Sequence, residues 1–285
     1  MSFAAIFNRL TQIVNLLYKK CLSEGKREVK MIKKTSKSDF SLNKSPNSGV
    51  KLIKSGIPGM DDLLKGGIRE GSAVLISGGP GTGKTILALQ FLIEGAKNGE
   101  PGLLVVYDTG DGELLDHADT LGLELRRYVE SGMITLLKQD MLIKKVPSLV
   151  APLDMINQKK IKRVALDSLT MFSYIHVSDD KDYRLKIVNF LESMKNITLM
   201  ATAEASGLNI DEVNFRPEDF MFDGVVFLTK IRQEASFERV IHVSKMRGQD
   251  HQINVYPFAI GQGGITVYPN QLPFSLLREE GKNKR

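Results

Sequence analysis

One stretch of this chain constrains its fold more than any other: an apolar run, a glycine-rich turn and a helical pattern, in that order. The run Ala73–Ser77 has the composition of a short buried strand. It leads into Gly-Gly-Pro-Gly-Thr-Gly-Lys-Thr at 78–85, and apolar residues at helical spacing follow from Ile86 to Lys97. A strand, the pattern GxxxxGK(S/T) and a helix form the complete context of a phosphate-binding loop, or P-loop. The sequence therefore predicts a nucleoside triphosphate site.

Each residue type in this loop suits a phosphate ligand. Glycines let the backbone approach phosphate oxygens and turn its N–H groups inward, and the start of the helix adds its positive dipole end. We expect Lys84 to reach the β- and γ-phosphates of ATP and Thr85 to bind Mg²⁺. The predicted nucleotide-binding residues are Gly78, Gly79, Pro80, Gly81, Thr82, Gly83, Lys84, Thr85 and Ile86.

A second metal-site residue is expected at the end of another strand. In Ile161–Asp167, basic residues lead into an apolar run that ends in an acid. A P-loop needs such a carboxylate to hold the metal through its water shell. We therefore assign Asp167 to Mg²⁺. The alternative is an aspartate that caps the following helix or turn.

The rest of the chain predicts an α/β fold with a mostly parallel, twisted sheet. Strand-like runs at 102–107, 133–137, 162–166 and 197–202 alternate with helical patterns near 112–120, 147–159 and 181–194. Such alternation of apolar strands and helices is typical of a parallel sheet covered on both faces. After about residue 224, closely spaced strands predict an antiparallel C-terminal extension, at 224–231, 236–246, 253–260 and 264–268. No internal repeat is visible, so we expect one nucleotide-binding domain.

The charge is unevenly distributed along the chain. The whole chain carries +6, but residues 1–50 alone carry +7, which leaves −1 for the remainder. We therefore expect a basic leader and linker at 1–50, an ATP-binding domain at 51–270 and a basic tail at 271–285. The single cysteine, Cys21, excludes a disulfide scaffold and fits the cytoplasm.

Apolar residues at helical spacing between Phe3 and Cys21 predict an amphipathic leader helix. Four interpretations stay open. Residues 1–21 could anchor the chain at a membrane surface, or dock on a partner or a neighbouring subunit. The helix could instead pack on its own domain, or translation could start at Met31, which would leave the leader out of the protein.

Three separated signatures resemble the KaiC-like branch of the RecA superfamily, over about Lys51–Val267. Residues 55–68, here called the N-terminal signature, are similar to the family's segment before its first core strand. The P-loop and Asp167-Ser168 lie where the family has them. Asp223–Leu228, and Lys245-Met-Arg-Gly248 with His251, resemble its late strands and its Lys-x-Arg-Gly loop. The resemblance implies a RecA-like ATPase core, an archaeal source, hexameric rings or related oligomers, and ATP bound between neighbouring subunits.

The resemblance also gives Lys245 and Arg247 a catalytic role. In the family this loop points across the subunit interface at the neighbour's γ-phosphate, as an arginine finger does. Judged by spacing alone, a Lys and an Arg two positions apart on a strand would simply share one solvated face.

The chain departs from the family at the catalytic base. The family usually carries a glutamate, often a pair, at the end of the strand after the P-loop helix. Here that position falls on Asp108–Thr109 in one alignment and on Gly110 in another. We expect Asp108 to replace the glutamate in orienting water, with Asp111 or Glu113 as alternatives. These acids could also merely favour the next helix N-terminus. We expect slow hydrolysis, or binding with almost none.

Two further segments bear on function. Thr202 and Glu204 lie where RecA-like proteins place a polar residue that faces the γ-phosphate. The segment 205–221 corresponds to the DNA-contacting loop of recombinases, but it holds one arginine against four acids, which are Asp211, Glu212, Glu218 and Asp219. This balance would repel a phosphate backbone, so we disfavour nucleic acid as a partner.

The sequence thus predicts an oligomeric, ATP-binding and slowly ATP-hydrolysing regulatory or signalling protein that acts on an unknown protein partner. One alternative is a RadA/RadB-like DNA recombination or repair ATPase, for which the basic leader would hold the phosphate backbone. Another is a docking scaffold in which ATP is bound but not split. Autokinase activity stays open, although no residue identifies a phospho-acceptor.

Overall fold

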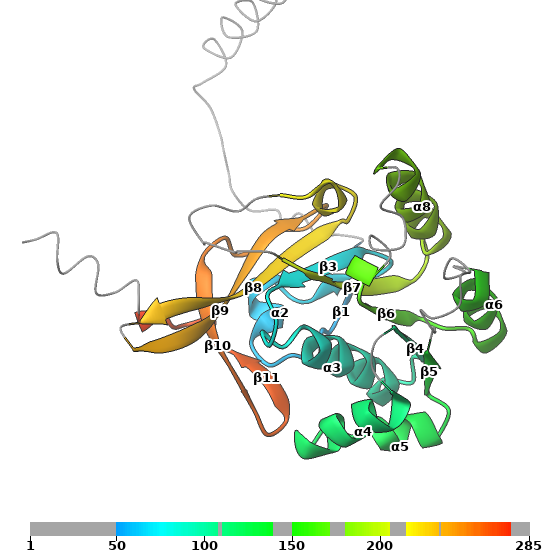
Figure 1. Cartoon of the computed structure of the whole chain (residues 1–285), viewed down its shortest axis with the longest axis horizontal. Helices are drawn as coiled ribbons and strands as arrows, with labels where there is room; N and C mark the ends of the chain where they lie inside the picture. Colours follow the sequence, from blue (N-terminus) through cyan, green and yellow to red (C-terminus); the bar gives the residue numbers. More distant parts are fainter. Residues whose placement is uncertain are drawn as a thin grey trace, which may run out of the picture. The chain divides into compact units, whose positions relative to one another are not determined.

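The computed structural model describes residues 50–107, 110–138, 150–171, 180–205, 215–233 and 235–274 (Figure 1). The predictions for the leader, the linker, the basic tail beyond 274 and the pair Asp108–Thr109 lie outside these residues, so the proposed domain boundaries stay predictions. Among the helices in the described ranges, none combines the length and the apolar character that crossing a bilayer requires.

A nine-stranded sheet forms the centre of the described chain, in the order β11-β10-β9-β8-β3-β7-β6-β4-β5. The strands from β8 to β5 in this order run parallel, and β9, β10 and β11 continue the sheet antiparallel. This arrangement confirms the predicted mostly parallel sheet with an antiparallel extension. The bounds are β3 Ala73–Gly78, β4 Gly102–Val106, β5 Ile134–Lys138, β6 Arg163–Asp167, β7 Thr198–Glu204, β8 Gly224–Gln233, β9 Ser236–Met246, β10 Val255–Gly261 and β11 Gly264–Val267.

Helices cover both faces of this sheet (Figure 1). On β4, Leu104 and Val106 pack into one core, and Leu103 and Val105 pack into the other. Because both faces are buried, these strands appear in the sequence as unbroken apolar runs. The first core is covered by α3 (Lys84–Lys97), α4 (Asp111–Thr120) and α5 (Leu125–Glu130), and the second by α6 (Val150–Lys159) and α8 (Asp180–Ser193).

The N-terminal signature folds into a small element of its own. The strands β1 (Leu52–Ile53) and β2 (Ile68–Arg69) pair antiparallel around the short helix α2 (Met60–Leu63). Gly59 adopts φ 81°, and a Cβ atom there would overlap the carbonyl group of Val267 on β11. The signature therefore demands glycine at this position because it packs directly against the last strand of the sheet.

Hydrogen bonds to three different segments close the outer edge of β11 and the turn just before it. Backbone groups at a sheet edge need partners just as those inside the sheet do. The bonds are Gly263 N–H to the Leu121 carbonyl at 2.7 Å, Val267 N–H to the Pro58 carbonyl at 2.9 Å, and both backbone groups of Ile265 to the side-chain amide of Gln90 at 2.8 and 3.1 Å. The N-terminal signature, the P-loop helix α3 and the end of α4 thus all hold this strand.

Candidate functional site

The predicted P-loop connects the end of β3 to the start of α3, as its strand and helix patterns indicate. Gly81 and Gly83 adopt φ angles of 66° and 100°, a region that glycine enters without steric cost. A Cβ atom on Gly78 would overlap the carbonyl oxygen of Leu228 and the hydroxyl of Thr82. The Thr82 hydroxyl donates to the carbonyl of Gly79 at 2.8 Å and closes the turn. Glycine is therefore required by the loop conformation itself.

Lys84 is the first residue of α3 and reaches back over the loop. Its Nζ donates to the carbonyl oxygens of Gly78 at 2.9 Å and Gly79 at 3.0 Å. Burial lowers the pKa of the Lys84 ammonium, and the negative charges of Asp167 and Glu204 partly oppose that shift. The ammonium thus lies in the turn where phosphate oxygens would meet it.

Asp167, at the end of β6, joins the two predicted halves of the metal site. The Thr85 hydroxyl donates to Asp167 Oδ2 at 2.6 Å, and the Thr202 hydroxyl of β7 donates to Oδ1. Hydroxyl and carboxylate oxygens are the ligands that Mg²⁺ prefers, so the residues present fit this ion. Within the described ranges, no cluster of three or more His, Cys, Asp or Glu offers an alternative cage. Such a site would leave most of the coordination sphere to phosphate and water oxygens.

The two predicted phosphate-facing residues of β7 differ in their surroundings. Thr202 is buried and touches Asp167 through its hydroxyl. Glu204 pairs with Gly78 across the sheet, its side chain is exposed, and its charge acts on Lys84. Both residues therefore lie at the P-loop end of the sheet.

Only some of the candidate catalytic bases lie within the described residues. Asp108 and Thr109 lie outside the described residues, and Gly110 and Asp111 mark the start of α4. Glu113, in the first turn of α4, is exposed and shares a pocket with Thr85. Glu113 therefore lies next to the P-loop.

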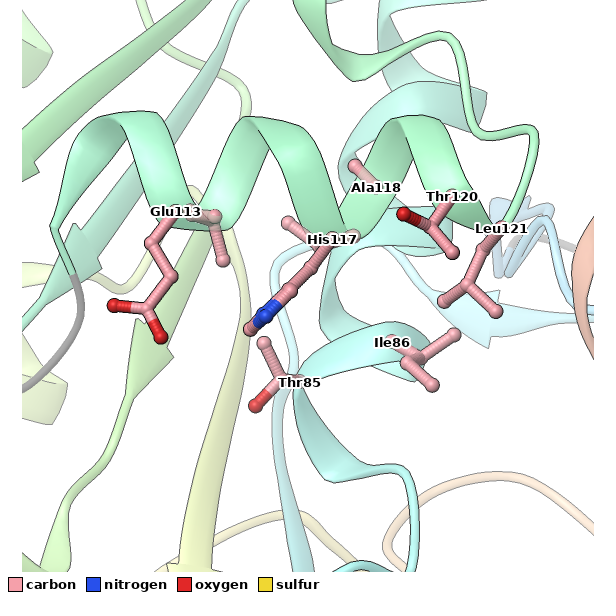
Figure 2. A pocket seen from close by; sticks show the side chains of 9 residues that line it. Thr85, Ile86, Glu113, His117, Ala118, Thr120 and Leu121 are labelled. Atoms are coloured by element: carbon pink, nitrogen blue, oxygen red, sulfur yellow. The ribbon is translucent and has the colours of Figure 1, made fainter.

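This pocket, of about 400 Å³, lies between the start of α3 and α4 (Figure 2). Glu113 and His117 point from α4 toward the start of α3, where Thr85 lies below them (Figure 2). Within the described chain, neither side chain has a hydrogen-bond or ion-pair partner. The lining residues are Thr85, Ile86, Leu89, Glu113, Leu114, His117, Ala118, Thr120 and Leu121.

The sequence-based prediction missed His117 and Thr120. A signal was present, because Glu113, His117 and Thr120 are spaced four and three residues apart and therefore share one face of α4. Apolar residues occupy the same face, so the spacing alone resembles an ordinary core-facing helix.

Lys245 and Arg247 lie near the amino-terminal ends of the parallel strands, whereas the P-loop of the same chain lies at their carboxyl-terminal ends. Gly78, at the P-loop end, pairs with Leu228, whereas Met246 pairs with Gly224 at the other end of β8. The Lys245 ammonium donates to three carbonyl oxygens, of Asp219, Phe220 and Phe222, at 2.6–3.4 Å, and Arg247 donates to the Phe220 carbonyl at 2.7 Å. Neither residue meets the P-loop of its own chain.

The segment before β8 corrects one argument made from sequence. Glu218 and Asp219 form part of the short 3₁₀ helix η1 (Pro217–Phe220) and are only 8% and 3% exposed. Burial raises the pKa of Asp219, and Arg216 lies 3.4 Å from the Glu218 carboxylate. The expectation that these two acids would repel a phosphate backbone is therefore wrong, because they do not face solvent.

Comparison with known proteins agrees with this geometry. A sequence model described as "ATPase: KaiC" matches residues 53–272. A UPF0273 protein of Methanopyrus kandleri is 30% identical over 256 residues, which cover 82% of this chain and 97% of that protein. The circadian clock oscillator protein KaiC of a Nostoc species is 31% identical over 234 residues, which cover 78% of this chain and 45% of the clock protein. The chain thus spans about half the length of that relative.

A solved structure is similar as well. The crystal structure of a KaiC-like protein from the hyperthermophilic archaeon Pyrococcus horikoshii superimposes with a TM-score of 0.67 at 32% identity, and the match covers 77% of this chain and all of that one. The family model and the match to this structure lead to one conclusion: this chain belongs to the KaiC family of RecA-like ATPases.

Proposed function

We propose that this chain binds ATP with Mg²⁺ at the P-loop edge of its sheet and hydrolyses it slowly, as a subunit of an oligomeric regulatory or signalling protein. The observation that carries the proposal is the hydrogen bond between Thr85 and Asp167. It joins two motifs that are far apart in the sequence into one set of oxygen ligands, directly beside the Lys84 ammonium.

Each residue of this candidate site has a role in the proposal. The backbone of Gly78–Ile86 holds the phosphates, and Lys84 supplies positive charge to the β- and γ-phosphates. Thr85 and Asp167 hold Mg²⁺, directly and through water. When bound, the ion neutralises charge that develops on the phosphate oxygens. Asp108 orients the attacking water, and Glu113 is the alternative for this role.

The pocket of Figure 2 is our proposed site for the nucleoside. It starts at Thr85 and Ile86, immediately beside the phosphate loop, and its volume falls in the range of small-ligand sites. Its apolar walls suit a flat base. Its polar groups, from Glu113, His117 and Thr120, offer partners for the ribose hydroxyls and the base edge.

Single-turnover hydrolysis of bound ATP tests the proposal. We expect slow turnover in the wild type, no stable binding in Lys84→Ala, and retained binding without turnover in Asp108→Asn. If Asp108→Asn turns over normally and Glu113→Gln does not, Glu113 is the water-orienting group. A wild-type chain that retains ATP without splitting it would favour the scaffold alternative. A wild-type chain that binds no ATP would refute the proposal.

A further inference from the structure

We propose that a second pocket, between the carboxyl-terminal ends of α6 and α8, binds a small organic anion in which a phosphate or carboxylate group is attached to an apolar body. The pocket has a volume of about 480 Å³, which falls in the range of small-ligand sites. Both helices cover the same face of the sheet (Figure 1). The pocket lies where β6 and β7 begin, whereas Asp167 and Glu204 lie where these strands end. It is therefore separate from the nucleotide site, and the inference does not rest on the proposed function.

Positive charge dominates the lining of this pocket. Lys160, Lys162 and Lys195 line it, against one carboxylate, that of Glu192. Lys195 and Glu192 form an exposed ion pair at 2.7 Å. The ammonium groups of Lys160 and Lys162 have neither a hydrogen-bond nor an ion-pair partner in the part of the chain that the structure describes. Two unpaired ammonium groups on one pocket suit a ligand with negatively charged oxygens.

Two side-chain amides add uncharged donors. Asn157 and Asn196 line the pocket and are exposed, and among the described residues neither amide has a hydrogen-bond partner. An amide NH₂ group can donate to a phosphate or carboxylate oxygen beside the lysines. The Ser193 hydroxyl is different, because it donates to the Phe190 carbonyl at 2.6 Å. The donors available to a ligand therefore come from the lysines and the two asparagines.

Apolar side chains line the same pocket. Ile156, Ile161 and Ile197 are 6%, 4% and 8% exposed, so they lie deeper than the exposed lysines and asparagines. A free inorganic ion would leave these side chains without a contact. A ligand that places an apolar body against them and its anionic group among the lysines uses both parts of the lining.

The backbone of Lys160 is unusual for a lysine. Helix α6 ends at Lys159, and Lys160 follows with φ 52°. The Ile161 N–H closes this turn on the Ile156 carbonyl at 3.0 Å. Glycine, or sometimes asparagine, is the usual residue at such a position, because a side chain is disfavoured there. Residues held in such conformations are concentrated at ligand-binding sites, so a lysine at this position indicates a use for its ammonium group.

Hydrogen bonds fix the backbone that carries these side chains. The Lys162 N–H donates to the Pro101 carbonyl at 2.8 Å, and the Lys162 carbonyl accepts from the Thr198 N–H at 3.1 Å. The Ile197 N–H donates to the Met194 carbonyl at 2.8 Å. Because this backbone is already ordered, a ligand has to immobilise only the lysine side chains, which lowers the entropic cost of binding.

A simpler interpretation is that the lysines only offset the negative ends of α6 and α8. In that case their ammonium groups should bond to the last carbonyls of the helices. Asn98 does this at the end of α3, where its amide donates to the Glu94 carbonyl at 2.8 Å. Within the described ranges, Lys160 and Lys162 form no such bond. The simpler interpretation therefore does not account for them.

Calorimetric titration of the full chain tests the proposal, in a Lys84→Ala background that weakens phosphate binding at the P-loop. The probes are phenyl phosphate, benzoate, inorganic phosphate and benzyl alcohol. We expect phenyl phosphate or benzoate to bind saturably at one site, at least tenfold more tightly than inorganic phosphate or benzyl alcohol. The tighter of the two identifies the anionic group. Binding should weaken as the salt concentration rises. Saturable binding by neither, or equally tight binding of benzyl alcohol, would overturn the inference.

Substitutions at the end of α6 assign the binding to this pocket. Lys160→Gly, added to the same background, should lower the affinity at least tenfold without lowering the melting temperature, because glycine suits φ 52°. The matched control is Lys159→Ala. Lys159 is the preceding exposed lysine, but it is not among the lining residues, and it donates to the Thr135 hydroxyl at 3.0 Å. We expect this control to bind the probe as its parent does.

Two results would refute the assignment. Unchanged affinity in Lys160→Gly would show that the pocket does not hold the anion. An equal loss in Lys159→Ala would show that only the general positive charge of this surface matters. With Lys84 intact, Lys160→Gly should bind ATP as the wild type does. Weakened ATP binding in that variant would contradict the separation of the two sites.

Discussion

The strand β6 begins with Arg163 and ends with Asp167, and these two charged side chains differ in their burial and in their hydrogen-bond partners. Arg163 is 1% exposed and is held by three hydrogen bonds. Its guanidinium binds the Glu100 carboxylate at 2.6 Å and the carbonyls of Lys54 and Phe91 at 2.8 and 3.0 Å. Asp167 is only partly buried and accepts hydrogen bonds from two threonine hydroxyls, which can exchange partners readily.

The same difference in hydrogen bonding is seen between the two ends of the parallel strands. At the end of the sheet where β6 begins, Arg163 and Lys245 both donate to backbone carbonyl oxygens. At the edge of Asp167, Glu113 and Glu204 keep exposed carboxylates, and Lys84 bonds only to the loop that a phosphate would fill. Arg163 thus bonds to partners from three distant segments of the fold, whereas Lys84 bonds only to its own loop.

Removing Arg163 should have the largest effect. In Arg163→Met the Glu100 charge and two carbonyl oxygens lose their partner, and breaking a buried pair in this way costs about 3–5 kcal/mol. Because Glu100 is 25% exposed, we expect the lower end of that range. Urea unfolding measures it, with Lys162→Met, an exposed neighbour on the chain, as the control. Equal free energies of unfolding for the two variants would contradict the claim that Arg163, at the start of β6, stabilises the fold.

Lys84→Ala tests the other edge. We expect ATP affinity to fall about 100-fold, roughly 2.7 kcal/mol, because a charge-assisted contact to phosphate is lost. The free energy of unfolding should stay within about 0.5 kcal/mol, since the ammonium bonds only to the loop. Titration with a fluorescent ATP analogue measures the affinity. Lys97→Ala, at the exposed end of the same helix, should bind as the wild type does.

The sequence allowed much of this molecule to be predicted, for a physical reason. The P-loop and the buried strands are local patterns, since one glycine-rich turn or one apolar run is enough to specify each. Asp167 could be found in the same way because it ends such a run. These features explain why the fold class was predicted correctly, and why the P-loop and Asp167, whose roles stay predictions, could be assigned from local patterns.

Other features depend on contacts between distant segments. The two-residue strands β1 and β2 are too short to show any periodicity. The carbonyl cage around Lys245 and the burial of Glu218 and Asp219 arise from backbone that no local pattern marks. The pocket beside α4 forms only where α3 packs against α4. The sequence of α4 alone therefore does not distinguish His117 from an ordinary helical residue.

Two glycines sharpen the comparison further, because both adopt left-handed backbone angles. Gly99 has φ 74° with open space around it, and Gly59 has φ 81° with the Val267 carbonyl in the way. We expect Gly99→Ala to cost about 1 kcal/mol and Gly59→Ala about 2 kcal/mol or more, because the latter must also displace β11. Thermal unfolding of both variants measures the difference. Equal costs would show that the N-terminal signature does not hold β11.

The smallest effect concerns His242 on β9. Burial lowers its pKa below the ordinary value of 6.5, the charge of His251 adds to this, and its contact with Asn254 opposes it. The unfolded chain therefore binds a proton more readily than the folded one. The contribution of His242 to stability is complete above pH 6.5 and is lost as the pH falls through the lowered pKa. Between pH 7 and pH 5 we expect the free energy of unfolding to fall by less than about 1 kcal/mol because of His242, and this contribution should be absent in His242→Gln. Parallel pH profiles of the two proteins would contradict this.

The closed edge of β11 has a consequence for how copies of the chain can meet. An open edge strand is a template on which another chain can add a strand, and through which aggregates and swapped dimers grow. Here three outward backbone groups of β11, those of Ile265 and the N–H of Val267, already have partners, and at Ile265 a glutamine side chain takes the place of a neighbouring strand. Growth of the sheet from one molecule into the next is therefore blocked at these positions of β11, and association on this side of the sheet must proceed through side chains, which a bound ligand can influence.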